Sequence, residues 1–169
     1  VFRHKYRGVW QPIDWQTYAE RAAAFALGLE TLGVGHGDRV AIHSENRPEW
    51  VYADLAVESL RGIVVGVYPT NPTAELRYLL QISGSKVVVC EDQEQLDKAL
   101  EALPDCPAIE HLIVIDPKGT RHYEHPAIVS YDEIERRGAE LVAAQPGRFA
   151  ELVAATDPDD PAVIVYTSG

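Results

Sequence analysis

The amino-acid sequence predicts an α/β protein with a doubly wound, mainly parallel sheet and helices on both faces. Four short apolar runs start at Arg39, Ile63, Lys86 and Leu112, at steps of 24, 23 and 26 residues. Each run is rich in β-branched residues and apolar on both faces, as is typical of parallel strands covered on both sides. Helical patterns fill the gaps, and such alternation indicates right-handed βαβ units.

The first helix is expected directly after Asp14, whose side chain suits the N-cap position. Apolar residues then recur at steps of four and three, which gives the helix one core-facing stripe: Tyr18, Ala22, Phe25, Leu29 and Leu32. Gly33 stands where a left-handed residue would end this helix.

The later helices carry their own end signals. Pro48 suits the first turn of the second helix, and Thr73 is expected to cap the third, which Gly84 ends. Two pairs have the spacing of a capping box at the starts of the fourth and fifth helices: Asp92 with Gln95, and Ser130 with Glu133.

A fifth apolar run, Ala162–Tyr166, follows after a longer gap and predicts a buried strand. Segments 116–129 and 145–161 are expected to be polar loops. Residues 1–10 are basic and aromatic, without a helical period.

The overall charge excludes some functions. A formal net charge of −11 argues against binding nucleic acid, because phosphate backbones require clusters of Lys and Arg. It also argues against electrostatic docking on anionic membranes. No run approaches the roughly 20 apolar residues of a transmembrane helix, and no leader peptide is recognisable. Val1 and the lack of Met indicate an excerpt of something longer.

Ligands of open α/β sheets lie beyond the carboxyl ends of the strands. The loops after His43, Val67, Ile115 and Tyr166 are therefore the candidate positions. The last passes into Thr167-Ser168-Gly169, whose hydroxyls and accessible backbone amides suit oxyanions such as phosphates. An ordinary strand-ending turn is the alternative for this short motif.

Other motifs favour structural roles. "SENRPEW" at 44–50 joins a strand to a helix, where Asn46 can satisfy exposed amides, and "YPTNP" at 68–72 predicts a rigid turn. His122 and His125 lack matching ligands for a metal. No Gly-x-Gly-x-x-Gly follows a strand, which argues against a Rossmann dinucleotide site.

The two cysteines, Cys90 and Cys106, fit no CxxC or zinc spacing. Cys90 ends an apolar run and is expected to be a buried free thiol.

Taken in order, the motifs resemble a known family. They are Asp14-Trp15 with Tyr18-Ala19-Glu20, "GLETLGVGHGDRVAI", "ENRPEW", "GVYPTNPTAELRYLLQISGSKVVV" and "DDPAVIVYTSG". Together they look like the AMP-forming acyl-CoA synthetases, members of the adenylate-forming enzymes, from about Trp10 to Gly169. "NRPEW" and "VCEDQEQLDKAL" are most similar to the long-chain fatty acid branch.

The resemblance implies a site at the end of the chain. The family's phosphate loop reads Tyr-Thr-Ser-Gly-(Ser/Thr)-Thr-Gly-x-Pro-Lys-Gly, of which only the first four positions are present here. Thr167, Ser168 and Gly169 would bind ATP phosphates, while Tyr166 would belong to the strand end. Residues 1–169 would thus be part of an N-terminal AMP-binding domain cut within its phosphate loop, without the C-terminal domain. No catalytic residue or metal ligand is assigned to it.

The implied reaction joins a fatty acid to CoA at the expense of ATP, through an acyl-adenylate. ATP, Mg²⁺ and CoA are implied for the whole enzyme, with none held tightly by this chain, and the chain alone is expected to be inactive. An enzyme that loads a carrier protein and a non-catalytic α/β binding module are the alternatives. A cytoplasmic location is expected; peripheral membrane contact and a homodimer both stay open.

Overall fold

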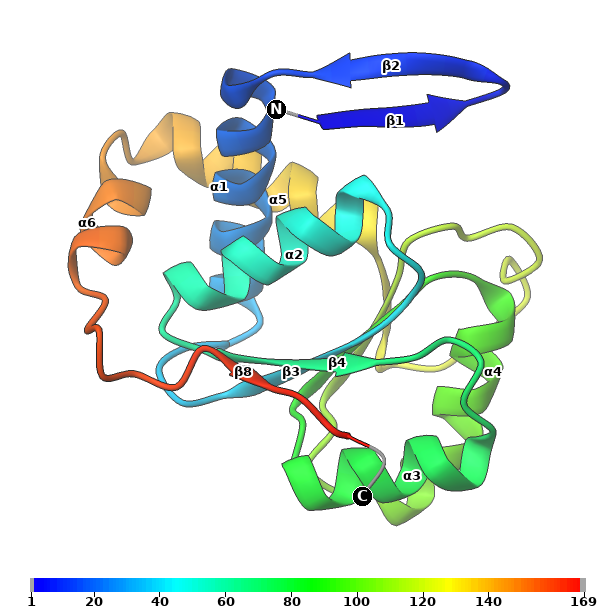
Figure 1. Ribbon diagram of the computed structural model, residues 1–169. Helices are drawn as coiled ribbons and strands as arrows, with labels where there is room; N and C mark the ends of the chain where they lie inside the picture. Colours follow the sequence, from blue (N-terminus) through cyan, green and yellow to red (C-terminus); the bar gives the residue numbers. More distant parts are fainter. Residues whose placement is uncertain (1, 168–169) are drawn as a thin grey trace.

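A six-stranded parallel sheet forms the centre of the computed structural model, which describes residues 2–167 (Figure 1). The strands are β1 (Phe2–Tyr6), β2 (Val9–Ile13), β3 (Arg39–His43), β4 (Ile63–Val67), β5 (Val87–Cys90), β6 (His111–Val114), β7 (Ile128–Ser130) and β8 (Val163–Ile164). The helices are α1 (Trp15–Thr31), α2 (Pro48–Ser59), α3 (Thr73–Ser83), α4 (Gln93–Ala102), α5 (Tyr131–Ala144) and α6 (Arg148–Ala154), with a 3-10 turn at Leu103–Asp105.

The strand order across the sheet is β7-β6-β5-β3-β4-β8, and every neighbouring pair is parallel. β3 lies inside the sheet, with Val40 opposite Val64 of β4 on one side and Val87 of β5 on the other. The chain moves from β3 to β4, crosses back to β5, and continues outward to β7. This crossing confirms the predicted doubly wound α/β fold.

Each face of the sheet has its own apolar core. Val40 and Ile42 of β3 point to the face covered by α1, α2 and α5. Ala41 points to the opposite face, which α3 and α4 cover. The side-chain alternation along one strand therefore supplies both cores, as expected for a strand buried on both sides.

Most predicted helix ends are confirmed. The Asp14 carboxylate accepts a hydrogen bond from the Thr17 backbone N–H at 2.8 Å, and Ser130 Oγ accepts one from Glu133 N–H at 3.2 Å. Asp92 caps α4 through Glu94 N–H at 2.8 Å. Gly84 ends α3 in the left-handed conformation, with φ 60°.

Some details of the capping prediction are wrong. Thr73 is the first residue of α3 and not its cap, because Pro72 holds the extended cap conformation at φ −67° and ψ 159°. The Thr73 hydroxyl instead donates to Glu101 at 3.2 Å. The Gln95 side chain does not close a capping box: its amide lies 3.5 Å from the Pro69 carbonyl oxygen.

The two segments expected to be polar loops contain regular structure. Segment 116–129 runs into β7, three residues that pair with β6. Segment 145–161 contains α6, whose Phe149 and Leu152 pack against the core under α1 and α2. Both elements are short, so tertiary contacts stabilise them more than their own sequence pattern does.

β8 is shorter and less buried than predicted. Only Val163 and Ile164 pair with β4, and they do so at the edge of the sheet. Val163 is 50% exposed and Val165 is 71% exposed. Residues 162–166 have apolar side chains on both faces of the strand, but the face that carries Val163 and Val165 is exposed to solvent.

The first residues form a β-hairpin that lies apart from the main sheet. β1 and β2 pair antiparallel through Arg7 and Gly8, a two-residue turn with φ 49° and 83°. Positive φ at both positions is the conformation that tight hairpins favour. The hairpin extends beyond the amino end of α1 (Figure 1).

Helices α1 and α5 touch backbone to backbone. A Cβ atom on Gly138 would lie 1.6 Å from the Ala24 carbonyl oxygen, and one on Gly28 would lie 2.2 Å from the Ile134 carbonyl oxygen. No side chain larger than hydrogen fits at either position while the helices keep this separation.

We expect Gly138→Ala to lower the free energy of unfolding by about 3 kcal/mol, the upper range for overpacking in a core. Urea denaturation measures the change. Gly35→Ala is the matched control, because a Cβ atom there would meet nothing within 4 Å. Equal unfolding midpoints for the two variants would contradict the close helix contact.

Candidate functional site

A pocket of about 220 Å³ lies at the carboxyl ends of β3, β4 and β8. Its lining residues come from the loop after β3, from α2, and from β4 and β8 with the residues that follow them: Ser44, Asn46, Trp50, Gly66, Val67, Tyr68, Val163, Ile164, Val165 and Tyr166. The loops after His43 and Val67, two of the positions that the sequence indicated for a ligand, therefore meet here beside Tyr166.

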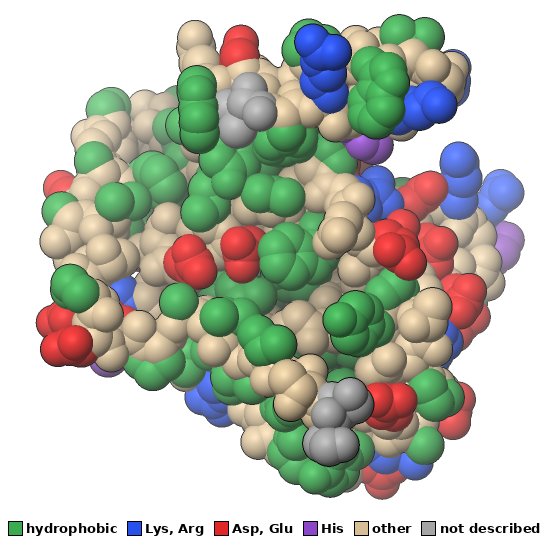
Figure 2. Space-filling model, in the orientation of Figure 1, with side chains coloured by type: hydrophobic (Ala, Val, Ile, Leu, Met, Phe, Trp, Pro, Cys, Tyr) green, Lys and Arg blue, Asp and Glu red, His purple; other side chains and the backbone are tan. Residues whose placement is uncertain are grey.

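The walls of this pocket are largely aromatic and aliphatic. Trp50 comes from α2, Tyr68 follows β4, and Tyr166 follows β8. Tyr68 is 74% exposed, so its ring is free to contact a ligand. Figure 2 shows hydrophobic side chains collecting over α2 and beside β8 on this face.

The loop that carries Tyr68 is tied to helix α4. The Lys98 ammonium donates to the Pro69 carbonyl oxygen at 2.9 Å. The Asn71 backbone N–H donates to the Tyr68 carbonyl oxygen at 3.1 Å and closes the predicted turn at 68–72. These bonds fix the position of Tyr68 at the rim of the pocket.

Of the three residues expected to bind phosphate, the structure describes Thr167. Thr167 is exposed and follows Tyr166 of the pocket wall. Ser168 and Gly169 lie outside the described residues. The phosphate role of all three stays a prediction.

The crevice between the loops after β3 and β5 is occupied by a side chain. The chain leaves β3 into α2 on one face and β5 into α4 on the other, so ligands are expected between them. Here the Glu91 carboxylate accepts hydrogen bonds from Glu45 N–H at 2.7 Å and Ser44 Oγ at 3.4 Å. Arg47 lies 3.7 Å from the same carboxylate.

Glu91 was missed in the sequence, although an acidic residue directly after an apolar run was a usable signal. Asn46 does not cap α2 as expected. Arg47 occupies the cap position, where its side chain makes no capping hydrogen bond, and Pro48 removes one of the free N–H groups.

The fourth candidate loop, after Ile115, does not reach the pocket. It follows β6, which β5 separates from the strands of the pocket. Its residues Asp116 and Lys118 line a separate hollow together with Asp92 and Asp97. In residues 2–167 there is no group of three or more His, Cys, Asp or Glu that could hold a metal ion.

His43 ends β3 with its side chain fully buried. Neither ring nitrogen has a hydrogen-bond partner among residues 2–167. Burial lowers the pKa of His43 to about 4, because the charged imidazolium would lose its hydration. The ring therefore stays neutral in the folded protein at pH 7.

Cys90 is a buried free thiol, as predicted, and Cys106 is free as well. Burial raises the pKa of both thiols, and both therefore remain protonated at neutral pH.

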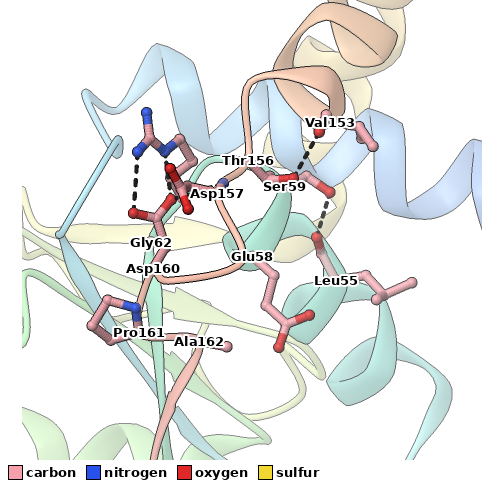
Figure 3. A pocket seen from close by; sticks show the side chains of 11 residues that line it. Leu55, Glu58, Ser59, Gly62, Val153, Thr156, Asp157, Asp160, Pro161 and Ala162 are labelled. Carbon is pink, nitrogen blue, oxygen red and sulfur yellow. Dashed lines mark hydrogen bonds and ion pairs between the residues drawn. The ribbon is translucent and has the colours of Figure 1, made fainter.

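A second pocket of about 260 Å³ lies at the amino ends of β4 and β8 (Figure 3). There the Arg61 guanidinium binds Asp160 through two hydrogen bonds, of 2.6 and 3.1 Å. These bonds hold the pKa of the Asp160 carboxyl well below its usual range. The His36 ring also lies 3.2 Å from Asp160. This pocket is at the opposite end of the sheet from the expected ligand position, and its ion pair anchors the segment that enters β8.

No helix within residues 2–167 is long and apolar enough to cross a membrane.

A family model described as "AMP-binding enzyme" matches residues 3–169. The long-chain-fatty-acid–CoA ligase FadD15 of Mycobacterium bovis is 30% identical over 169 residues, which are 100% of this chain and 26% of that protein. The long-chain-fatty-acid–CoA ligase ACSBG2 of Xenopus laevis is 26% identical over 95% of this chain and 21% of its own length. The chain thus spans about a quarter of the length of these relatives.

Solved structures share the fold. Coronafacic acid ligase from Pectobacterium brasiliense superposes with a TM-score of 0.67 at 20% identity, over 75% of this chain and 25% of that one. The anthranilate CoA ligase AuaEII, in complex with anthranoyl-AMP, gives 0.62 at 23% identity, over 72% and 21%.

We expect the buried His43 to make stability depend on pH. Its pKa is about 4 in the folded state and about 6.5 when unfolded. The unfolded chain therefore takes up the proton first, and stability present above pH 6.5 is lost as the pH falls toward 4. The loss attributable to this residue is about 3 kcal/mol.

Chemical denaturation of the wild type and of His43→Leu from pH 7 to pH 4 measures this difference. The variant should lose less stability on acidification. Parallel curves would show that His43 is not the group responsible.

Proposed function

Since this chain belongs to the family of AMP-binding enzymes, we propose that it is part of the N-terminal domain of an ATP-dependent, AMP-forming fatty acid–CoA ligase. The observation that carries the proposal is the similarity along all 169 residues to proteins named long-chain-fatty-acid–CoA ligases. The motifs from Asp14 to Gly169 support the same family.

The proposed reaction has two steps. A fatty acid carboxylate attacks the α-phosphorus of ATP, which gives an acyl-adenylate and releases pyrophosphate. The thiol of CoA then attacks the acyl carbonyl carbon, and AMP leaves. The first step concentrates negative charge on phosphate oxygens, so donors held in place before the reaction contribute most to its rate.

The residues of this chain act at the carboxyl end of the sheet. We propose that Thr167, Ser168 and Gly169 donate hydrogen bonds to ATP phosphates. The pocket of Trp50, Tyr68 and Tyr166, directly before Thr167 in the sequence, would give that ligand an apolar contact surface. The contacts of Glu91 with Glu45 N–H and with Arg47 hold the loop after β5 against the loop after β3.

The names of the relatives favour CoA as the acyl acceptor over a carrier protein. The test is to let the whole enzyme form the acyl-adenylate, to add either CoA or a carrier protein, and to measure which of the two becomes acylated. We also propose a cytoplasmic location, where ATP and CoA are available together.

We expect the isolated 169-residue chain to form no acyl-adenylate, because it spans about a quarter of the length of its relatives. The measurement is exchange of labelled pyrophosphate into ATP in the presence of a fatty acid. Exchange by the purified chain above the rate without enzyme would contradict this expectation.

In the whole enzyme, we expect Thr167→Val to lower the rate of pyrophosphate exchange about 100-fold, the typical cost of one preorganised donor. Thr156→Val is the matched control, because Thr156 lies in the pocket at the opposite end of the sheet. An unchanged rate for Thr167→Val would remove this hydroxyl from the phosphate site, and equal losses in both variants would indicate a general folding defect.

A further inference from the structure

The hairpin of β1 and β2 carries a local charge opposite to that of the whole chain. Residues 2–13 contain Arg3, Lys5 and Arg7 and no Asp or Glu, whereas the chain has a formal net charge of −11. Figure 2 shows basic and hydrophobic side chains side by side where the hairpin projects at the upper right.

The tip of the hairpin combines these cations with exposed apolar side chains. Tyr6, Val9 and Trp10 are each more than half exposed. The Lys5 ammonium lies 5.9 Å from the centroid of the Trp10 ring, and the Arg7 guanidinium lies 5.2 Å from that of Tyr6. Tyr6 and Trp10 are on opposite faces of the hairpin, so each face of the tip carries one cation over one ring.

The base of the hairpin is fixed to the body of the protein. Phe2 packs edge-on against Tyr18 of α1, with the ring centroids 5.7 Å apart, and also contacts Tyr52 of α2 at 6.3 Å. The turn at Arg7 and Gly8 has the geometry of a tight hairpin. The tip is therefore held away from the acidic body in a defined direction.

We propose that this tip, residues 5–10, docks on an anionic phospholipid surface. Lys and Arg are attracted to acidic headgroups, with about 1 kcal/mol for each cation near the surface. Trp and Tyr favour the boundary between headgroups and acyl chains, since their rings are apolar at one end and polar at the other. The formal charge of the whole chain does not prevent this, because fields beyond the Debye length of about 8 Å are screened.

The hairpin and the candidate site share residues. A groove between the hairpin and the start of α2 is lined by Phe2, Arg3 and His4 and by Asn46 and Trp50. Asn46 and Trp50 also line the pocket at the carboxyl ends of the strands. If the hairpin docks on a membrane, this pocket is brought close to the bilayer in which a fatty acid substrate dissolves. The docking proposal is argued from the hairpin alone. Only the delivery of a fatty acid to the pocket rests on the proposed function.

The test is co-sedimentation of the chain with vesicles of phosphatidylserine and phosphatidylcholine, compared with phosphatidylcholine alone. We expect binding to the anionic vesicles, weakened by salt. Lys5→Gln/Arg7→Gln should reduce partitioning roughly 30-fold, whereas Lys5→Arg/Arg7→Lys should retain it. Lys118→Gln/Arg121→Gln is the charge-matched control, because both residues are exposed in the loop after β6.

Trp10→Ala should also weaken binding, and the blue shift of tryptophan fluorescence that anionic vesicles cause in the wild type should be smaller in this variant. Only variants whose unfolding midpoint equals that of the wild type are compared, so that a folding defect is not taken for weaker binding. Equal binding of the Lys5→Gln/Arg7→Gln variant and the control would overturn the proposal. So would binding that is equal for neutral vesicles, or a hairpin-dependent dimer that does not bind vesicles. None of these readouts requires ligase activity.

Discussion

The contact between Gly28 and Gly138 is the constraint on which the outer half of the structure depends. β7 and β8 lie at opposite edges of the sheet, so the chain has to cross one whole face between them. Helix α5 makes this crossing above α1, and only two glycine surfaces allow the helices to approach so closely. The edge strand β8, and with it one wall of the candidate site, therefore depends on a helix contact far from the pocket.

The candidate site and the hairpin differ from each other in local charge and side-chain type, although both belong to an acidic chain. At the carboxyl ends of the strands, Glu91 occupies the usual crevice and the remaining pocket is aromatic. At the hairpin, cations are gathered where no carboxylate is near in the sequence. The net charge described the average surface correctly, but it gave no information about a twelve-residue segment with the opposite sign.

Much of the fold was predictable, because its signals are local. β3 and β4 match the predicted runs end for end, and Asp14 and Ser130 cap the helices that they were expected to cap. β7, α6 and the hairpin were not predicted, since each is short and is stabilised by contacts with distant residues. In the site, the meeting of the loops after β3 and β4 followed from topology. The filling of the crevice by Glu91 did not, because it depends on side-chain packing across two strands.

The position of β8 also has a consequence for the order of folding. Val64 and Val163 pair although 99 positions separate them, whereas β3 to β6 are joined by short helical connections within residues 39–114. Closing the longer loop costs more chain entropy, and contacts distant in sequence generally form late. During synthesis the inner four strands can assemble while α5 is still being made. Strand β8, which forms one wall of the candidate site, is then added after the inner four strands.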